Sequence, residues 1–156
     1  DNMLHIVLEA YKNMPDKKLV LISNWRISDY GIKLKKEYSD IDNIFLINAV
    51  YQQEELDLLR SNAALYIHSH SVCGTAPSLV EAMSLSIPII SYNSPTNLSS
   101  TNNDTLYFDS VSSLISIVSG IGNEQLDMIR EKMTVLAKER YTWKIVSEKY
   151  KNAILS

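Results

Sequence analysis

The stretch Leu65-Tyr-Ile-His-Ser-His-Ser-Val-Cys-Gly-Thr-Ala-Pro-Ser-Leu-Val-Glu-Ala-Met-Ser-Leu-Ser-Ile-Pro-Ile-Ile-Ser-Tyr92 decides the fold. It begins with a short apolar segment (65–68), continues through a polar turn into a segment of helical spacing (77–85), and ends in an isoleucine-rich segment (87–92). Short apolar segments are typical of buried strands, and proline is favoured in the first turn of a helix. The pattern therefore predicts a strand, a helix and a second strand, which form a right-handed parallel unit within one sheet.

The same alternation extends to both sides of this unit. Upstream, the pattern predicts helices over 4–11, 31–38 and 53–60 and strands over 19–22 and 43–47; downstream, it predicts a polar loop over 93–104, a strand over 106–108 and three helical stretches. Repeated units of this kind predict an α/β fold, a Rossmann-like parallel sheet with helices on both faces. Ligands of such sheets bind at the carboxyl ends of the strands, so the segments after Ser23, Asn48, His68 and Tyr92 are the candidate site.

Size and composition narrow the class of protein. A chain of 156 residues, 46% hydrophobic, suits one domain over residues 1–156. Its net charge of -3 and the lack of a basic block argue against a nucleic-acid partner. A single cysteine, Cys73, excludes an internal disulfide and a cysteine zinc cluster and indicates a reducing compartment, the cytoplasm. No apolar run reaches the roughly 20 residues that cross a bilayer, so we expect any membrane contact to be peripheral, at the inner face of the plasma membrane.

The turn between the strand at 65–68 and the helix at 77–85 has the features of an anion site. Gly74 and Thr75 stand just before Pro77, and Ser78 follows in the first helical turn. Amides at a helix N-terminus are unpaired and carry partial positive charge, and glycine lets a phosphate approach the backbone. Thr75 either caps the helix or contacts the ligand. The alternative is an ordinary capped turn without a ligand.

Glu81 lies among apolar residues of the same predicted helix. Burial of an unpaired carboxylate is costly, so we expect Glu81 to have a dedicated partner. A carboxylate accepts two hydrogen bonds side by side, which suits the two hydroxyls of a ribose. In the alternative interpretation, Glu81 caps a neighbouring backbone group or reaches solvent.

Other polar residues follow the predicted strands. His68 and His70 beside one thiol lack a convincing third and fourth metal ligand, so we expect no metal. We expect one histidine, His70, to face an anionic ligand and the other to be packed and hydrogen-bonded. Asn24 is a candidate ligand contact, and Trp25 either contacts a ligand or packs. Cys73 is better explained by its place in the turn than as a nucleophile.

These motifs resemble a known family. The span 19–108 and the later Arg140-Tyr-Thr-Trp143 are similar to the C-terminal domain of family-four retaining glycosyltransferases of the GT-B architecture. That family usually carries two glutamates eight residues apart, the second of which binds the donor ribose; Glu81 matches the second, and Cys73 stands in place of the first. The Cys73-Gly-Thr-Ala-Pro-Ser78 turn is most similar to the Gly-Gly-Thr-Asn-Pro-Ser turn of a rhamnosyltransferase-like subgroup of polysaccharide-assembly enzymes, although Cys73 and Ala76 depart from it.

The resemblance implies transfer of a sugar from a nucleotide-diphosphate sugar to a growing bacterial surface polysaccharide, such as lipopolysaccharide O-antigen or capsule, with the anomeric configuration kept. The acceptor glycan can be lipid-linked, and the resemblance implies no cofactor, no metal and no catalytic residue on this chain. The residues expected to bind the nucleotide sugar are Asn24, His70, Cys73, Gly74, Thr75, Ser78 and Glu81.

The sequence opens on Asp1, and a helical pattern begins almost at once. We interpret the chain as a fragment of a two-domain enzyme, inactive without its acceptor-binding N-terminal domain. The resemblance also implies a central strand before Asp1, ending in an arginine. Two alternatives stay open: a GT-B sugar-nucleotide epimerase, which needs no acceptor, and a noncatalytic Rossmann-like assembly module.

Overall fold

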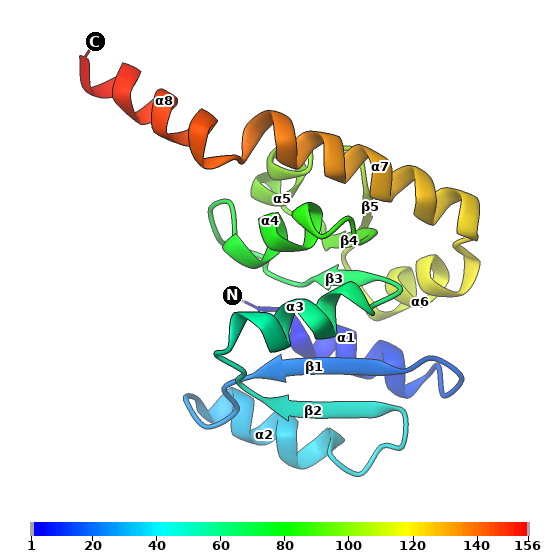
Figure 1. Ribbon diagram of the computed structural model, residues 1–156. Helices are drawn as coiled ribbons and strands as arrows, with labels where there is room; N and C mark the ends of the chain where they lie inside the picture. The colour runs from blue at the N-terminus through cyan, green and yellow to red at the C-terminus, as the bar shows by residue number, and fades with distance from the viewer. Residues whose placement is uncertain (1, 156) are drawn as a thin grey trace.

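The computed structural model describes residues 2–155, so Asp1 and Ser156, the ends of the expected domain, lie outside the described residues. Strands and helices alternate along the chain as the sequence predicts (Figure 1). The strands are β1 (Leu19–Ser23), β2 (Ile44–Asn48), β3 (Tyr66–His68), β4 (Ile89–Tyr92) and β5 (Leu106–Phe108). The helices are α1 (Leu4–Lys12), α2 (Asp29–Tyr38), α3 (Gln53–Ser61), α4 (Pro77–Ser84), α5 (Pro95–Ser100), α6 (Val111–Gly120), α7 (Asn123–Arg140) and α8 (Trp143–Leu155).

One expected loop contains a helix. The polar segment over 93–104 includes α5, which begins with Pro95 in its first turn after Ser94. The Ser94 hydroxyl accepts a hydrogen bond from the backbone N–H of Asn97 and so caps the helix. Serine followed by proline is a common start for a helix, and here this local preference overrides the polar composition.

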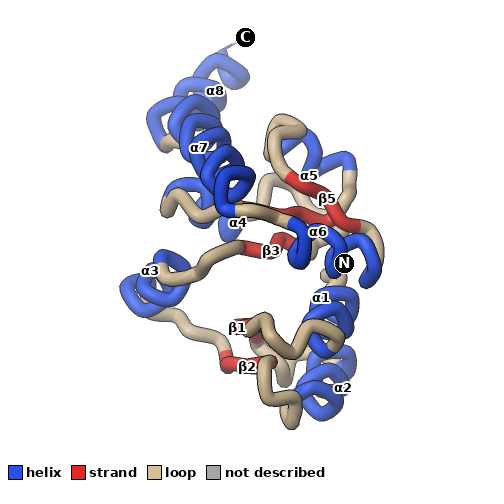
Figure 2. Tube along the Cα trace, turned by 90° about the vertical axis from the view of Figure 1, so that its right-hand side faces the viewer, coloured by secondary structure: helices blue, strands red, loops and turns tan. Residues whose placement is uncertain are grey.

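All strand pairs are parallel, which confirms the predicted fold class. The strands form two sheets, β1-β2 and β3-β4-β5. In β1-β2, Leu21 pairs with Leu46; in the other sheet, Ile67 pairs with Ile90, and Ser91 with Tyr107. β1 and β3 are the facing edges of the two sheets but stand apart in Figures 1 and 2, and no ladder joins them among the described residues.

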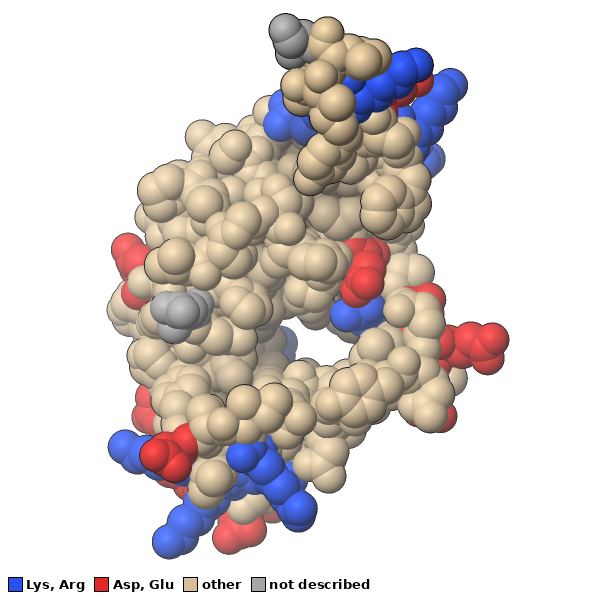
Figure 3. Space-filling view, turned by 90° about the vertical axis from the view of Figure 1, so that its left-hand side faces the viewer, with Lys and Arg blue, Asp and Glu red and all other residues tan. Residues whose placement is uncertain are grey.

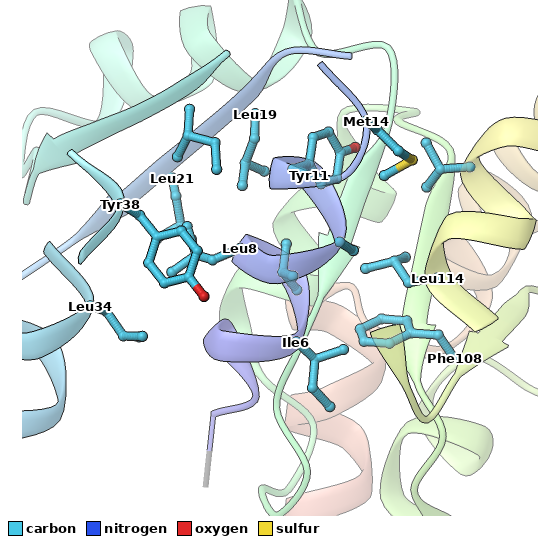
Figure 4. Close-up of a cluster of buried hydrophobic side chains, with 14 of the residues drawn as sticks. Ile6, Leu8, Tyr11, Met14, Leu19, Leu21, Leu34, Tyr38, Phe108 and Leu114 are labelled. Atoms are coloured by element: carbon cyan, nitrogen blue, oxygen red, sulfur yellow. The ribbon is translucent and has the colours of Figure 1, made fainter. Parts of the chain in front are cut away.

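Helices cover both faces of the strands. Figure 2 shows α1 and α2 on one side and α3 on the other. One apolar core packs α1, α2 and α6 against the strands (Figure 4), and a second core packs α4 and α7 on the opposite face. The neighbours Ile89 and Ile90 in β4 are both fully buried, one in each core. Because successive side chains of a strand point to opposite faces, this strand is buried on both of them.

An opening passes through the molecule between the two sheets. The arrows of β1 and β2 point to the left in Figure 1, and Figure 3 shows the molecule from that side. The background is visible through an opening near the centre of this view. We call this opening the channel; the unpaired edges of β1 and β3 lie on either side of it. On β1, the side chain of Val20 is 52% exposed, and α3 contributes no buried residue to either core among those described.

The last helix, α8, extends away from the two cores (Figure 1). It has no buried residue in its described range, and Trp143 and Tyr150 are largely exposed. The apolar side chains of this helix therefore do not belong to either core. Between residues 2 and 155, no helix has both the length and the apolar character of a membrane span.

Candidate functional site

The turn after β3 leads directly into α4 at the carboxyl edge of its sheet, as predicted. Ala76 is the N-cap residue of α4, and no side chain caps this end of the helix. Thr75 does not act as the cap; its hydroxyl lies 3.3 Å from that of Ser100 at the end of α5. The contact links the turn to α5 and leaves the first turn of α4 without a side-chain acceptor.

Gly74 has no evident structural reason to be glycine. Its φ angle does not lie in the left-handed region, and a Cβ atom built on it would meet nothing within 4 Å. The backbone at this position is exposed. Glycine here therefore leaves the backbone open to close approach from outside the fold.

Glu81 has a protein partner that the sequence did not reveal. Its Oε2 lies 2.6 Å from Nη1 of Arg60, a residue in the last turn of α3. The Glu81 side chain is 41% exposed, so the expected burial of this carboxylate is wrong. The expectation of a dedicated partner is correct, because the carboxylate is paired with a guanidinium.

The two histidines have different environments. His68 is 1% exposed and stacks on Tyr66, while its ring centroid lies 5.2 Å from that of the less buried His70. The prediction of a packed histidine is correct. Neither ring nitrogen of His68 makes a hydrogen bond of good geometry, and the nearby Asn97 side chain is its one weak polar partner among the described residues. Burial, with a contribution from nearby His70, lowers the pKa of His68 to about 4. The ring is therefore neutral near pH 7.

Asn97 joins the ends of two strands, a role that the sequence analysis missed. This residue of α5 is 1% exposed, and its Nδ2 donates to the backbone oxygens of His70, at 2.8 Å, and Tyr92, at 2.9 Å. Both oxygens belong to segments that leave the carboxyl ends of β3 and β4. The side chain thereby fixes the start of the turn that carries Cys73 and Gly74.

The remaining predicted residues divide between the two sheets. Cys73 is a partly exposed free thiol in the turn, and Ser78 is half-buried in the first turn of α4. Asn24 is exposed and follows β1, so it belongs to the other sheet. Trp25 is 2% exposed, and its Nε1 donates to the backbone oxygen of Ile47 at 2.7 Å, which identifies it as a packing residue. Six of the seven predicted site residues thus come from the β3–α4 segment.

Parallel strands covered by helices on both faces, with polar turns at the carboxyl edge, define a Rossmann-like α/β domain. The fold matches the structure of Anabaena Alr3699/HepE in complex with UDP-glucose, with a TM-score of 0.81 and 13% identity over 96% of this chain and 44% of that one. It also matches the pneumococcal O-GlcNAc transferase GtfA in complex with UDP and GlcNAc, with a TM-score of 0.66 and 18% identity over 97% of this chain and 32% of that one. The chain spans less than half the length of these two proteins.

Residues 2–108 match the family described as Glycosyl transferases group 1, and the chain belongs to that family. No curated protein matches the chain significantly.

Replacement of His68 by Phe tests the environment of this ring through pH. An ordinary histidine titrates near 6.5, whereas buried His68 titrates at about 4. Between these values the unfolded state binds the proton and the folded state does not, so stability falls as pH drops from 6.5 toward 4. The full difference between the two pKa values corresponds to about 3 kcal/mol in the free energy of unfolding. Urea unfolding at a series of pH values should show much of this dependence in the wild type and a flatter profile in His68→Phe, whereas parallel profiles would contradict the assignment.

Proposed function

We propose that the chain is the donor-binding domain of a retaining glycosyltransferase that transfers a hexosyl or deoxyhexosyl group to a growing bacterial surface polysaccharide. Membership of the glycosyl transferases group 1 family supports the reaction class. The resemblance of the Cys73–Ser78 turn to rhamnosyltransferase-like enzymes supports the polysaccharide acceptor, lipopolysaccharide or capsule. The proposed place of action is the cytoplasm, at the inner face of the membrane when the acceptor is lipid-linked.

The uncapped start of α4 carries the proposal for the donor. Its first turn has no side-chain cap, and Gly74 leaves the preceding backbone open. Helix N-terminal amides and a close-approaching backbone suit a diphosphate, which is the group that a nucleotide sugar presents. Two structures with this fold contain UDP together with a sugar, namely HepE with UDP and glucose and GtfA with UDP and GlcNAc.

The proposed role of this segment in the reaction is electrostatic. When the bond between sugar and diphosphate breaks, negative charge grows on the diphosphate and positive character grows on the sugar. Fixed amide dipoles near Gly74 and Thr75 stabilise that negative charge without reorganisation. The proposal assigns no catalytic base, metal or cofactor to this chain. His70, Cys73 and Ser78 lie along the same segment and are proposed to contact the donor, with Asn24 facing it from the other sheet.

Glu81 is proposed to bind the ribose of the donor. It lies on α4, one turn after Ser78, and its side chain is 41% exposed and so accessible to a ligand. Two neighbouring hydroxyls can donate to the carboxylate in charge-assisted hydrogen bonds.

Glu81→Gln should weaken nucleotide-sugar binding by about tenfold or more, because hydrogen bonds to a charged acceptor contribute roughly 1.5–3 kcal/mol each. Isothermal titration of the full-length protein measures this change. The protein should remain folded, with a somewhat lower melting temperature because the largely buried Arg60 guanidinium then faces a neutral amide. Glu131→Gln, on an exposed face of α7, is the matched control and should change neither quantity. Unchanged donor affinity together with a lower melting temperature would make Glu81 a structural residue.

We further propose that a β-strand upstream of Asn2 in the same polypeptide fills the channel. Backbone groups on the free edges of β1 and β3 can be satisfied by a parallel strand between them. The backbone N–H of Met3 donates to the Ser69 oxygen at 2.8 Å, which holds the start of α1 beside the carboxyl end of β3. A strand that ends there and continues into α1 makes a right-handed crossover to β1.

Hydrogen exchange of individual amides tests the filling of the channel. The backbone N–H of Leu19 donates to the backbone oxygen of Asn43, just before β2, and that of Tyr66 donates to the backbone oxygen of Pro88, just before β4. Both amides therefore point away from the channel. Since successive amides of a strand alternate in direction, those of Val20, Ile22 and Ile67 face it. These three should exchange fast in the 156-residue chain and slowly in the full-length protein. The control amides are those of Leu21 and His68, which should be protected in both; fast exchange of Val20 and Ile67 in the full-length protein would contradict the proposed strand.

An acceptor-binding domain completes the proposed enzyme. The exposed apolar residues of α8, among them Trp143 and Ile154, form a surface that another domain can cover. Positioning of both substrates is a large part of catalysis, so this chain alone is proposed to be inactive.

A further inference from the structure

We propose that Arg60 is a positioning residue of the donor site, which holds the Glu81 carboxylate ready for the ribose hydroxyls. The inference rests on the proposed role of Glu81. The ion pair between Arg60 and Glu81 joins α3 to α4, the helices that precede and follow β3 in the sequence, and we infer that it affects ligand binding.

The geometry shows a fixed cation beside an accessible anion. The Arg60 side chain is only 16% exposed, whereas that of Glu81 is 41% exposed, and Nη1 lies 2.6 Å from Oε2. Nη1 is buried, and the ion pair with Glu81 is the contact that compensates its charge among the described residues. The ion pair is formed at Oε2, one of the two carboxylate oxygens.

This arrangement leaves acceptor capacity for a ligand. An ionised carboxylate offers about four lone-pair positions. A guanidinium at Oε2 restricts the rotation of the Glu81 side chain, and the remaining positions stay available to two hydroxyls. Since ordering of a free side chain on binding costs affinity, a carboxylate that is already held binds the ribose more tightly.

The surroundings of Arg60 favour a role in the site over a role in stability. In its described range, α3 has no buried residue, so Arg60 does not anchor a packed helix in either core. Glu81 is open to solvent and stays hydrated when its partner is removed. Arg60→Gln also removes the buried charge itself, so it leaves no unpaired cation inside the protein. We therefore expect loss of the pair to alter ligand preference more than melting temperature.

The test uses isothermal titration of the full-length protein with two probes. The first probe is the ribonucleoside diphosphate of uracil, adenine, guanine or cytosine that binds most tightly. The second probe is the 2',3'-dideoxy analogue of that nucleotide. The ratio of the two affinities reports the contribution of the ribose hydroxyls. Arg60→Gln should lower this ratio by about three- to tenfold, the effect of ordering one side chain. Arg60→Lys should lower it less. The control is Arg130→Gln, which removes the exposed ion pair with Asp127 on α7 and should leave the ratio unchanged.

The double variant Arg60→Gln/Glu81→Gln should have the same ratio as Glu81→Gln alone, because Arg60 acts through that carboxylate. A normal ratio in Arg60→Gln beside a lowered one in Glu81→Gln would overturn the role of Arg60 and leave the ribose site intact. An increased ratio in Arg60→Gln, or equal loss of affinity for both probes, would also overturn it. If Glu81→Gln keeps the wild-type ratio, or the wild type binds none of the probes, the proposed donor site itself is wrong.

Discussion

One helix, α1, holds the two sheets in a common orientation, because its apolar side chains pack against both. In Figure 4, Leu8 and Tyr11 point toward β1, while Ile6 points toward Phe108 at the end of β5. Each fully buried side chain of this size contributes about 1.5–3 kcal/mol, so the helix is a substantial part of the core. No strand ladder connects the sheets among residues 2–155, and the packing of α1 takes its place.

The candidate site depends on this packing. Because both sheets point the same way, the segment after β1 and the turn after β3 reach the same end of the molecule. Asn97 then fixes the turn by donating to the segments that leave β3 and β4. The resulting arrangement places an uncapped helix start next to an open backbone at Gly74, with the Glu81 carboxylate one turn beyond the first residues of α4.

Local patterns were sufficient to predict the strands and most of the helices. Short apolar segments such as 19–22 and 87–92, separated by polar turns, are typical of strands, and both form strands here. The helix at Pro95 was missed because a run of Asn, Ser and Thr indicates a loop by composition, although Ser94-Pro95 is a helix-start signal. The sequence also predicted that Gly74 and Thr75 lie in the turn between β3 and α4 and that Ser78 lies in the first turn of α4.

Long-range partners could not be predicted in the same way. The contact between Arg60 and Glu81 depends on how α3 and α4 approach each other, and Arg60 alone indicates only a favourable charge in the last turn of a helix. The burial of His68 also depends on packing and has no signal in the order of residues.

The central claim is that the backbone around Gly74 and Thr75 receives the diphosphate of a nucleotide sugar. Crystals of the full-length protein soaked with uridine diphosphate test it most directly. The account predicts density for the diphosphate against the amides of Gly74 and Thr75, with the ribose beside Glu81. Ordered nucleotide bound only elsewhere on the molecule would contradict it.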